Sequence, residues 1–295
     1  MSQLWRFLLP GDDRTFGLLN AATVSHMPWT SDFKLDDESR SIRLVPQDGS
    51  PFAESCAAAM TRLLKAAQNT AAFPKLDNWP GEKFPVLASP FPFAVDRVIA
   101  PYFGIVSTGV QLTIFVRNEN GSIGGIWIAR RGATKPMYAG MLDNAAGGAV
   151  NHHELPFKGL LREAAEELDI DAHKATSGGT ISWLNIKDKR SGINEGLVEP
   201  GVQFVYDLEV SADTKLHPAE AGIDWLRLLS VEEVKSALVR REFKPSCACV
   251  MVDFFVRHGI INVENDRQFA ELVPRLHRRL LLPVTYPDIG QRQSL

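Results

Sequence analysis

The stretch from Gly148 to Ile170 constrains the fold of this chain more than any other segment. A proline at position 156 stands where a helix can begin, and apolar residues then recur at helical spacing. The pattern predicts an amphipathic helix over residues 156–168, with an apolar face made of Leu160, Leu161, Ala164, Ala165 and Leu168. Such a face has to be covered by another layer of the fold.

The opposite face of this helix is acidic. Glu163, Glu166 and Glu167 lie three or four residues apart and share one arc. Like charges at these spacings cost roughly 0.2–0.5 kcal/mol per pair, and a divalent cation would turn the repulsion into affinity. Carboxylate oxygens suit Mg²⁺ or Mn²⁺ rather than zinc. The alternative interpretation is a solvated acidic face on which Arg162 pairs with Glu166.

The spacing of residues in this stretch resembles the Nudix box, G-x5-E-x7-R-E-U-x-E-E-x-G-U, in which U is a bulky apolar residue. The matching positions are Gly148, Glu154, Arg162, Glu163, Glu166 and Glu167, with Ile170 closing the motif. The sequence departs from the motif twice: Ala164 replaces the bulky aliphatic residue, and Asp169 replaces the last glycine. Asp169 lies at the helix exit, so it bears on the exit turn more than on the chemistry.

Most of the chain from about residue 50 onward resembles one Nudix subgroup. This is the Nudix domain fused to fungal thiamine pyrophosphokinases, together with its stand-alone thiamine diphosphate-type diphosphatases. The segments that carry the resemblance are residues 54–68, 79–85, 96–148, 200–208 and 243–259. The resemblance implies an α/β fold: a Nudix α/β/α sandwich with a mixed sheet, preceded by a smaller α+β N-terminal domain. No residues remain for a kinase domain, so we expect the stand-alone hydrolase.

Local patterns outside the box predict further elements. Prolines crowd residues 28–92 and leave room for one long helix, over residues 51–68. Two β-rich runs, residues 111–117 and 125–130, flank an Asn-Gly turn and predict a hairpin. Further strands are expected over residues 202–208 and 225–229, and further helices over residues 231–240 and 247–259.

Length and composition bound the domain number and the partners. The 295 residues allow two domains, and a change of character near residue 105 predicts an N-terminal domain over 1–105 and a Nudix domain with C-terminal helices over 106–295. A formal net charge of −3 gives no global reason to bind nucleic acid or anionic lipid. Three cysteines favour a reducing compartment, and no signal peptide or membrane-length apolar run is found. We therefore expect a cytoplasmic protein without nucleic-acid or membrane partners.

The resemblance implies roles for the box residues. The catalytic set would be Glu154, Arg162, Glu163, Glu166 and Glu167. The last three carboxylates, with the backbone carbonyl of Gly148, would hold Mg²⁺, for which Mn²⁺ could substitute. Such ions neutralise a diphosphate and acidify a bound water. Arg162 and Glu154 would form an orienting pair, because a guanidinium keeps its charge whatever the metal occupancy.

Several residues outside the box are candidates for substrate binding or for a base. Arg130, Arg131 and Lys135 could bind the distal phosphate, although three cations in six residues also fit a solvated edge. Asp143 is expected to face the substrate, without an assigned role. The candidate bases, for which an ordinary surface loop is the alternative, are Glu220 and Asp224.

The remaining aromatic and metal-ligating residues receive structural interpretations. Rings that could stack on a substrate, but are more typical of a core, are Trp127, Trp183, Phe204 and Tyr206. His152 and His153 have no further zinc ligands at useful spacing. Cys247 and Cys249 would diverge on one helix, so we interpret them as small buried apolar side chains rather than as a metal or redox pair.

Four functions are compared on these features. The leading one is a Mg²⁺-dependent diphosphatase of thiamine diphosphate-type substrates, in particular oxidised oxo and oxy analogues, yielding the monophosphate and phosphate. The box recognises the diphosphate alone, so ADP-ribose, NADH or another nucleoside diphosphate derivative also fits. An isopentenyl diphosphate isomerase would need a cysteine close before the box, and residues 57–246 contain none. A non-catalytic binding module typically loses box carboxylates, which are all present here. The expected partner is a small-molecule diphosphate, and a homodimer is compatible with the sequence.

Overall fold

The largest part of the structure is a seven-stranded mixed sheet with the order β11–β12–β7–β8–β13. The computed structural model describes residues 3–47, 52–73, 76, 81–152 and 154–286. The central strand β7 (Ser107–Arg117) runs parallel to β12 (Val198–Glu209) and antiparallel to β8 (Ile123–Arg131). The outer strands are β11 (Thr176–Ile186) and β13 (Ile223–Leu229), and two short strands, β9 (Leu142–Asp143) and β10 (Ala146–Ala149), pair with β8 and β7.

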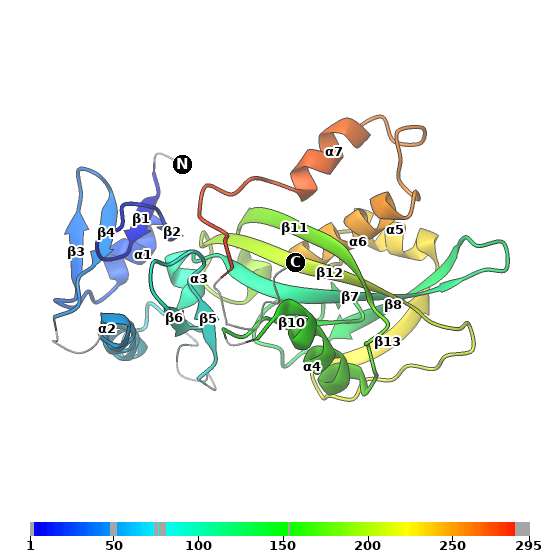
Figure 1. The fold of residues 1–295 in the computed structure, drawn as a ribbon, viewed down its shortest axis with the longest axis horizontal. Helices are drawn as coiled ribbons and strands as arrows, with labels where there is room; N and C mark the ends of the chain where they lie inside the picture. The colour runs from blue at the N-terminus through cyan, green and yellow to red at the C-terminus, as the bar shows by residue number, and fades with distance from the viewer. Residues whose placement is uncertain (1–2, 48–51, 74–75, 77–80, 153, 287–295) are drawn as a thin grey trace.

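Helices cover both faces of this sheet (Figure 1). The helix α4 (Pro156–Leu168) packs on the face that carries Val110 and Leu112, whereas α6 (Pro245–Arg257) packs on the face that carries Phe115. Two shorter helices, α5 (Val231–Val239) and α7 (Phe269–Leu276), lie on the α6 side. Successive residues of β7 point to opposite faces, which is why the sheet has two separate apolar clusters. The predicted α/β/α sandwich with a mixed sheet is therefore confirmed.

A smaller α+β unit precedes this sheet and lies at one end of it (Figure 1). Its four-stranded sheet has the order β2–β1–β4–β3, formed by β1 (Trp5–Leu8), β2 (Gly17–Leu19), β3 (Phe33–Asp36) and β4 (Ser41–Leu44). Its other elements are α1 (Ala21–His26), α2 (Phe52–Gln68), the hairpin β5 (Lys83–Pro85) and β6 (Ala94–Asp96), and α3 (Ala100–Phe103). Its core also includes Ala149 and Leu197 of the large unit, so the boundary near residue 105 stays a prediction.

The predicted elements are present with small shifts at their ends. The helix expected over 51–68 is α2, although Pro51 lies outside the described residues. The last predicted helix begins two residues early, at Pro245, because proline fits the first turn of a helix. The sequence patterns missed β11, α7 and the four-stranded N-terminal sheet. β11 contains Gly178 and Gly179 and is largely exposed at its start, so it lacks the alternation that identifies a strand.

The exit of α4 keeps the turn that a glycine forms in the Nudix motif. Asp169 has the left-handed backbone conformation, with φ 53°. Its N–H donates to the carbonyl of Ala165 at 3.0 Å, and the N–H of Ile170 donates to Ala164 at 3.4 Å. An aspartate at this place bears some steric strain, and its charge lies at the negative end of the helix dipole.

We expect Asp169→Gly to stabilise the protein without changing its active site. Removing the strain and the charge should raise the free energy of unfolding by about 0.5–1 kcal/mol, or the melting temperature by about 1–2 °C. Thermal unfolding measures this, with Asp169→Asn as a control that removes only the charge. A glycine variant that melts at or below the wild-type temperature would contradict the prediction.

Candidate active site

The acidic helix face and the two glycines of β10 meet at one edge of the large sheet. The N–H of Gly147 donates to Glu167 Oε2 at 2.8 Å. A Cβ on Gly148 would lie 2.0 Å from Glu163 Oε1, so a larger residue there would displace the Glu163 carboxylate. The sequence places these glutamates four residues apart, and the helix brings both to the same strand. Two carboxylates thus converge on a bare stretch of backbone.

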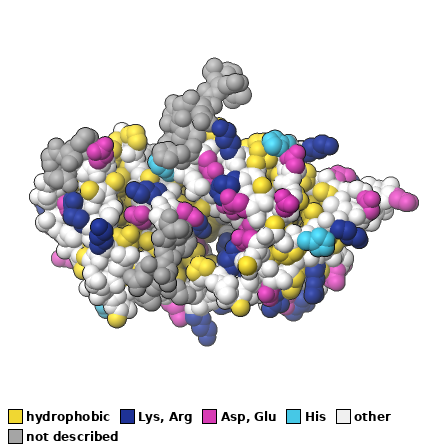
Figure 2. Space-filling view, turned by 90° about the horizontal axis from the view of Figure 1, so that it is seen from below, with side chains coloured by type: hydrophobic (Ala, Val, Ile, Leu, Met, Phe, Trp, Pro, Cys, Tyr) yellow, Lys and Arg dark blue, Asp and Glu magenta, His cyan; other side chains and the backbone are white. Residues whose placement is uncertain are grey.

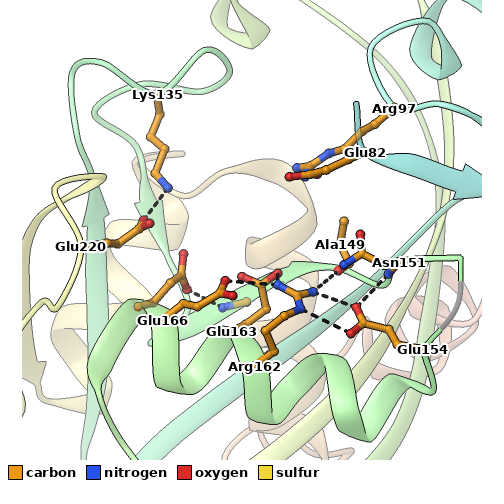
Figure 3. A network of polar contacts seen from close by, with 12 residues as sticks. Glu82, Arg97, Lys135, Ala149, Asn151, Glu154, Arg162, Glu163, Glu166 and Glu220 are labelled. Carbon is orange, nitrogen blue, oxygen red and sulfur yellow. Dashed lines mark hydrogen bonds and ion pairs between the residues drawn. The ribbon is translucent and has the colours of Figure 1, made fainter. Parts of the chain in front are cut away.

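Arg162 connects the other acidic residues of the helix (Figure 3). Its Nη2 donates to Glu154 Oε1 at 2.8 Å, and its Nη1 donates to Glu163 Oε1 at 2.8 Å and to Glu166 Oε2 at 3.2 Å. Nη2 also donates to the carbonyl of Ala149 at 3.1 Å. The hydrogen bond to Glu154 is the largest cause of a raised pKa of Arg162. The orienting pair is present, and so is the contact to Glu166 that the alternative interpretation named.

The backbone that faces Glu167 belongs to Gly147, one residue before the predicted ligand Gly148. In an antiparallel strand, the N–H and C=O of one residue point to the same side. The N–H of Gly147 points to Glu167, so its carbonyl points to the same open edge. The carbonyl of Gly148 points inward, 2.8 Å from the position of a Cβ on Gly109 of β7. The register of the sheet therefore favours Gly147 as the backbone ligand.

Burial changes the protonation of the two inner carboxylates. Desolvation raises the pKa of Glu167 to about 8, although the hydrogen bond from Gly147 acts in the opposite direction. Burial also raises the pKa of Glu163, against the charge of Arg162. Glu166 has an exposed side chain. Among the described residues Glu167 forms no ion pair, so a cation that reached it would remove a large desolvation cost.

The donor set fits Mg²⁺ or Mn²⁺. All candidate ligands are oxygens, and the pair formed by Glu163 and Glu167 borders the backbone of Gly147. Within the described residues no three His, Cys, Asp or Glu side chains stand in metal-ligating geometry, and Arg162 forms ion pairs with Glu163 and Glu166. A metal would therefore have to draw these two carboxylates partly away from the guanidinium.

Comparison with known proteins assigns this arrangement to a family. The model of the NUDIX domain matches residues 108–247. The uncharacterized protein YJR142W of Saccharomyces cerevisiae is 30% identical over 279 residues, covering 91% of this chain and 80% of that protein. Nudix hydrolase 20, chloroplastic, of Arabidopsis thaliana is 31% identical over 205 residues, covering 67% of this chain and 52% of that protein. The chain contains a Nudix domain.

The length of the relatives and the similar solved structures complete the comparison. The chain spans about half the length of the Arabidopsis relative. Among solved structures, the NUDIX domain of Shewanella oneidensis NrtR complexed with ADP ribose has a TM-score of 0.39 at 14% identity, over 52% of this chain and 90% of that one. A C. elegans Ap4A hydrolase has a TM-score of 0.38 at 12% identity, over 53% of this chain and all of that one. Likenesses this weak carry no argument about the substrate.

The adjacent candidates Arg130 and Arg131 lie on opposite faces of β8. Arg130 is exposed, and its charge acts on Glu242, away from the Nudix box. Arg131 points inward, where its Nη1 donates to Asp143 Oδ2 at 2.7 Å and its charge reaches Glu167. Strand alternation explains this separation. Of the two, only Arg131 is placed beside the box carboxylates.

Asp143 is partly buried and is hydrogen-bonded to Cys247, a residue that the sequence analysis did not place at the site. The thiol of Cys247 on α6 donates to Asp143 Oδ1 at 2.6 Å. Burial raises the pKa of Cys247 to about 12, so the thiol stays protonated. Burial alone would raise the pKa of Asp143, but Lys244 and Arg131 lower it by more. Cys247 is buried in the apolar cluster under α6, as interpreted, and its thiol in addition donates a hydrogen bond.

The two candidate bases differ in position. Glu220 accepts a hydrogen bond from Lys135 Nζ at 2.5 Å, and the two lie across from Glu166 (Figure 3). The N–H of Ala219 donates to the carbonyl of Glu167 at 2.8 Å, which ties this loop to the end of α4. Asp224 is exposed at a β-bulge of β13 and forms no ion pair within the described residues. Both remain predictions as bases, and the geometry favours Glu220.

The structure also places most of the aromatic rings that the sequence analysis considered as stacking partners. The rings of Trp127, Phe204 and Tyr206 belong to the apolar cluster under α4, as expected for core residues. The ring of Trp183 lies over Gly201. His153 is outside the described residues. No helix in the described part of the chain is both long and apolar enough to cross a bilayer.

Two buried glutamines beside the site have no counterpart in the sequence analysis. Gln111 of β7 lies against Gly147, and Gln203 of β12 lies against Gly109. The Oε1 atoms of both side chains are buried without a hydrogen-bond partner in the described structure. A buried unpaired acceptor costs about 1–3 kcal/mol, which a ligand can recover. Only the pairing of strands brings these two residues together.

We expect Glu167→Gln to stabilise the metal-free protein at pH 8. The pKa of Glu167 is about 8 in the folded protein and lower in the unfolded chain, so wild-type stability falls as pH rises from about 5 to 8. The amide does not titrate, and its advantage should reach about 1–3 kcal/mol at pH 8 and vanish near pH 4.

Thermal unfolding in EDTA measures this difference at each pH. Glu166→Gln is the matched control, because its exposed side chain should give no comparable gain. An equal effect of both variants, or one independent of pH, would contradict the burial of a charged Glu167.

Proposed function

We propose that this Nudix hydrolase is a Mg²⁺-dependent diphosphatase of thiamine diphosphate-type substrates, with oxidised oxo and oxy analogues as preferred substrates. The observation that carries the proposal is the convergence of Glu163 and Glu167 on the bare backbone of Gly147 and Gly148. Desolvated carboxylates whose charge is not fully neutralised favour the binding of a metal ion, and a metal ion at this position could bind a diphosphate.

Each group of residues at the site has a separate proposed role. Glu163, Glu166, Glu167 and the carbonyl of Gly147 would hold Mg²⁺, with Mn²⁺ as a substitute. When bound, the ion polarises the phosphorus centre and acidifies a water. Arg162 and Glu154 keep the carboxylates in register on the helix. Lys135 and Arg131 lie on the side where the distal phosphate would extend, and Glu220 is held by Lys135 where it could accept a proton.

Two features support a thiamine-type moiety. The first is the resemblance of most of the chain to the thiamine-related Nudix subgroup. The second is the pair of unsatisfied acceptors on Gln111 and Gln203, on the sheet face next to Gly147. An amide can present either oxygen or N–H, so it can pair with the amino group of a pyrimidine or with the oxo group of its oxidised analogue. The second candidate, a nucleoside diphosphate derivative such as ADP-ribose or NADH, would use the same metal site.

A product-resolved hydrolysis assay tests the proposal directly. The panel contains thiamine diphosphate, its oxo and oxy analogues, ADP-ribose, NADH and isopentenyl diphosphate, each with Mg²⁺. We expect the thiamine-type substrates to give monophosphate and phosphate at the highest kcat/KM, and Glu167→Gln to lose at least about a hundredfold. Preference for ADP-ribose or NADH would keep the mechanism and reject the substrate. Binding without turnover anywhere would reject hydrolysis.

Replacing Gln111 tests whether this side chain binds the heterocycle of the substrate. We expect Gln111→Leu to lower kcat/KM for thiamine-type substrates by about tenfold or more and to stabilise the free protein, because it removes a buried unpaired acceptor. Inhibition by inorganic pyrophosphate, which has no heterocycle, should stay unchanged. Equal loss for both ligands would show a damaged site instead of a lost contact.

A further inference from the structure

The hairpin of β5 and β6 carries a cross-strand ion pair beyond its last paired residues. Lys83 and Asp96 form the last pair of the ladder, and Glu82 and Arg97 lie one residue beyond it. The N–H of Arg97 donates to the carbonyl of Glu82 at 2.8 Å, and the two side chains form an ion pair. The guanidinium also stacks over the ring of Phe84, 5.5 Å from its centroid. Backbone, carboxylate and ring together fix the direction of the Arg97 side chain.

This arginine points toward the Nudix glutamates from outside the Nudix domain. Figure 3 shows Arg97 and Glu82 facing Arg162, Glu163 and Ala149, with Lys135 and Glu220 on the other side of the same space. The charge of Arg97 reaches Glu163, where it acts against the larger effect of burial on the pKa of that carboxyl. In Figure 2, acidic and basic side chains gather near the middle of the face that carries α4.

Two other cations of the site, Arg131 and Arg162, pair with carboxylates that are less exposed than Glu82. Arg162 is held by Glu154, Glu163 and the carbonyl of Ala149. Arg131 is held by Asp143, whose side chain is 14% exposed. The carboxylate that pairs with Arg97 is 40% exposed, and the Arg97 side chain itself is 29% exposed. A pair this open to water contributes little to stability and can exchange its anion.

We propose that Arg97 of the N-terminal unit binds a phosphate oxygen of the metal-bound diphosphate, and that Glu82 occupies the guanidinium until the substrate arrives. A guanidinium can donate two parallel hydrogen bonds to two oxygens of a phosphate, and arginine is therefore a common phosphate-binding residue. The N-terminal unit is then part of the active site. The inference rests on the proposed function only in taking a diphosphate as the ligand of the glutamate site.

The two partners of the ion pair have opposite predicted effects. Arg97→Ala should raise KM for thiamine diphosphate and lower kcat/KM by about 10–100-fold, the usual worth of a charged hydrogen bond. Arg97→Lys should recover part of the loss. Glu82→Gln removes the competing anion, so it should leave kcat unchanged and lower KM by about two- to fivefold. A merely structural ion pair would give losses of the same sign from both changes.

Lys83→Ala is the matched control. Lys83 belongs to the same hairpin and is exposed, but it neighbours Glu82 on the alternate side of the strand. Like Arg97→Ala, Lys83→Ala removes one positive charge from the hairpin, but it should change KM less than twofold. Melting temperatures of all four variants separate lost contacts from lost folding. An equal effect of Lys83→Ala and Arg97→Ala, or wild-type kinetics for Arg97→Ala, would overturn the proposal.

Calorimetric binding of inorganic pyrophosphate with Mg²⁺ separates this inference from the proposed substrate. Weaker binding by Arg97→Ala, with no turnover of any organic diphosphate by the wild type, would support the role of Arg97 and reject the proposed activity. Turnover by the wild type, with pyrophosphate bound equally by the wild type and Arg97→Ala, would reject the role of Arg97 alone. If the wild type neither binds pyrophosphate nor hydrolyses the panel, both proposals fall.

Discussion

One guanidinium keeps the acidic face of α4 together. Arg162 donates to Glu154, Glu163, Glu166 and the carbonyl of Ala149, so it joins the helix to the end of β10. Glu154 in turn accepts the N–H of Asn151 at 2.8 Å, which fixes the loop between strand and helix. Like charges three and four residues apart would otherwise repel. A lysine could not replace this arginine, because it lacks the fork that reaches several acceptors at once.

The same arrangement leaves one carboxylate uncompensated. Within the described residues Glu167 forms no ion pair with Arg162; its carboxylate accepts the N–H of Gly147, while burial opposes its ionisation. Glu154 therefore orients Arg162 and the loop before α4, whereas the ionised form of Glu167 is destabilised by desolvation. Stability is thus sacrificed at the position where a metal would return it, as is common for functional sites. The intact box glutamates divide into these two physical roles.

Local spacing predicted the part of the site that one helix and its cap contain. The contacts of Arg162 with Glu154 and Glu163 follow from residues within nine positions of each other. The choice of Gly147 over Gly148 needs the register of β10 on β7, and the bond between Asp143 and Cys247 joins residues 104 positions apart. No motif encodes such pairings. Strand alternation alone, however, could have separated Arg130 from Arg131, because adjacent strand residues face opposite sides.

The N-terminal unit was the least predictable part, because its short strands and prolines give weak periodic signals. Its contacts with the large unit are nevertheless specific. Tyr102 donates to Asn194 Oδ1 at 3.1 Å, Asn194 donates to the carbonyl of Ala72 at 2.9 Å, and Asn20 donates to the carbonyl of Gly196 at 2.8 Å. These bonds dock the unit on the loop between β11 and β12, and the shared apolar core around Leu197 seals the junction.

A hairpin held in this way has a defined position relative to α4, which a flexible linker would not give. Positioning a charge within hydrogen-bond reach of a ligand requires that kind of rigid support. The ion pair of Arg97 and Glu82 lies on the side of the hairpin that faces the glutamates (Figure 3). The docking contacts and the orientation of Arg97 thus have one consequence: a second unit bounds the site and adds a positive charge to an acidic centre.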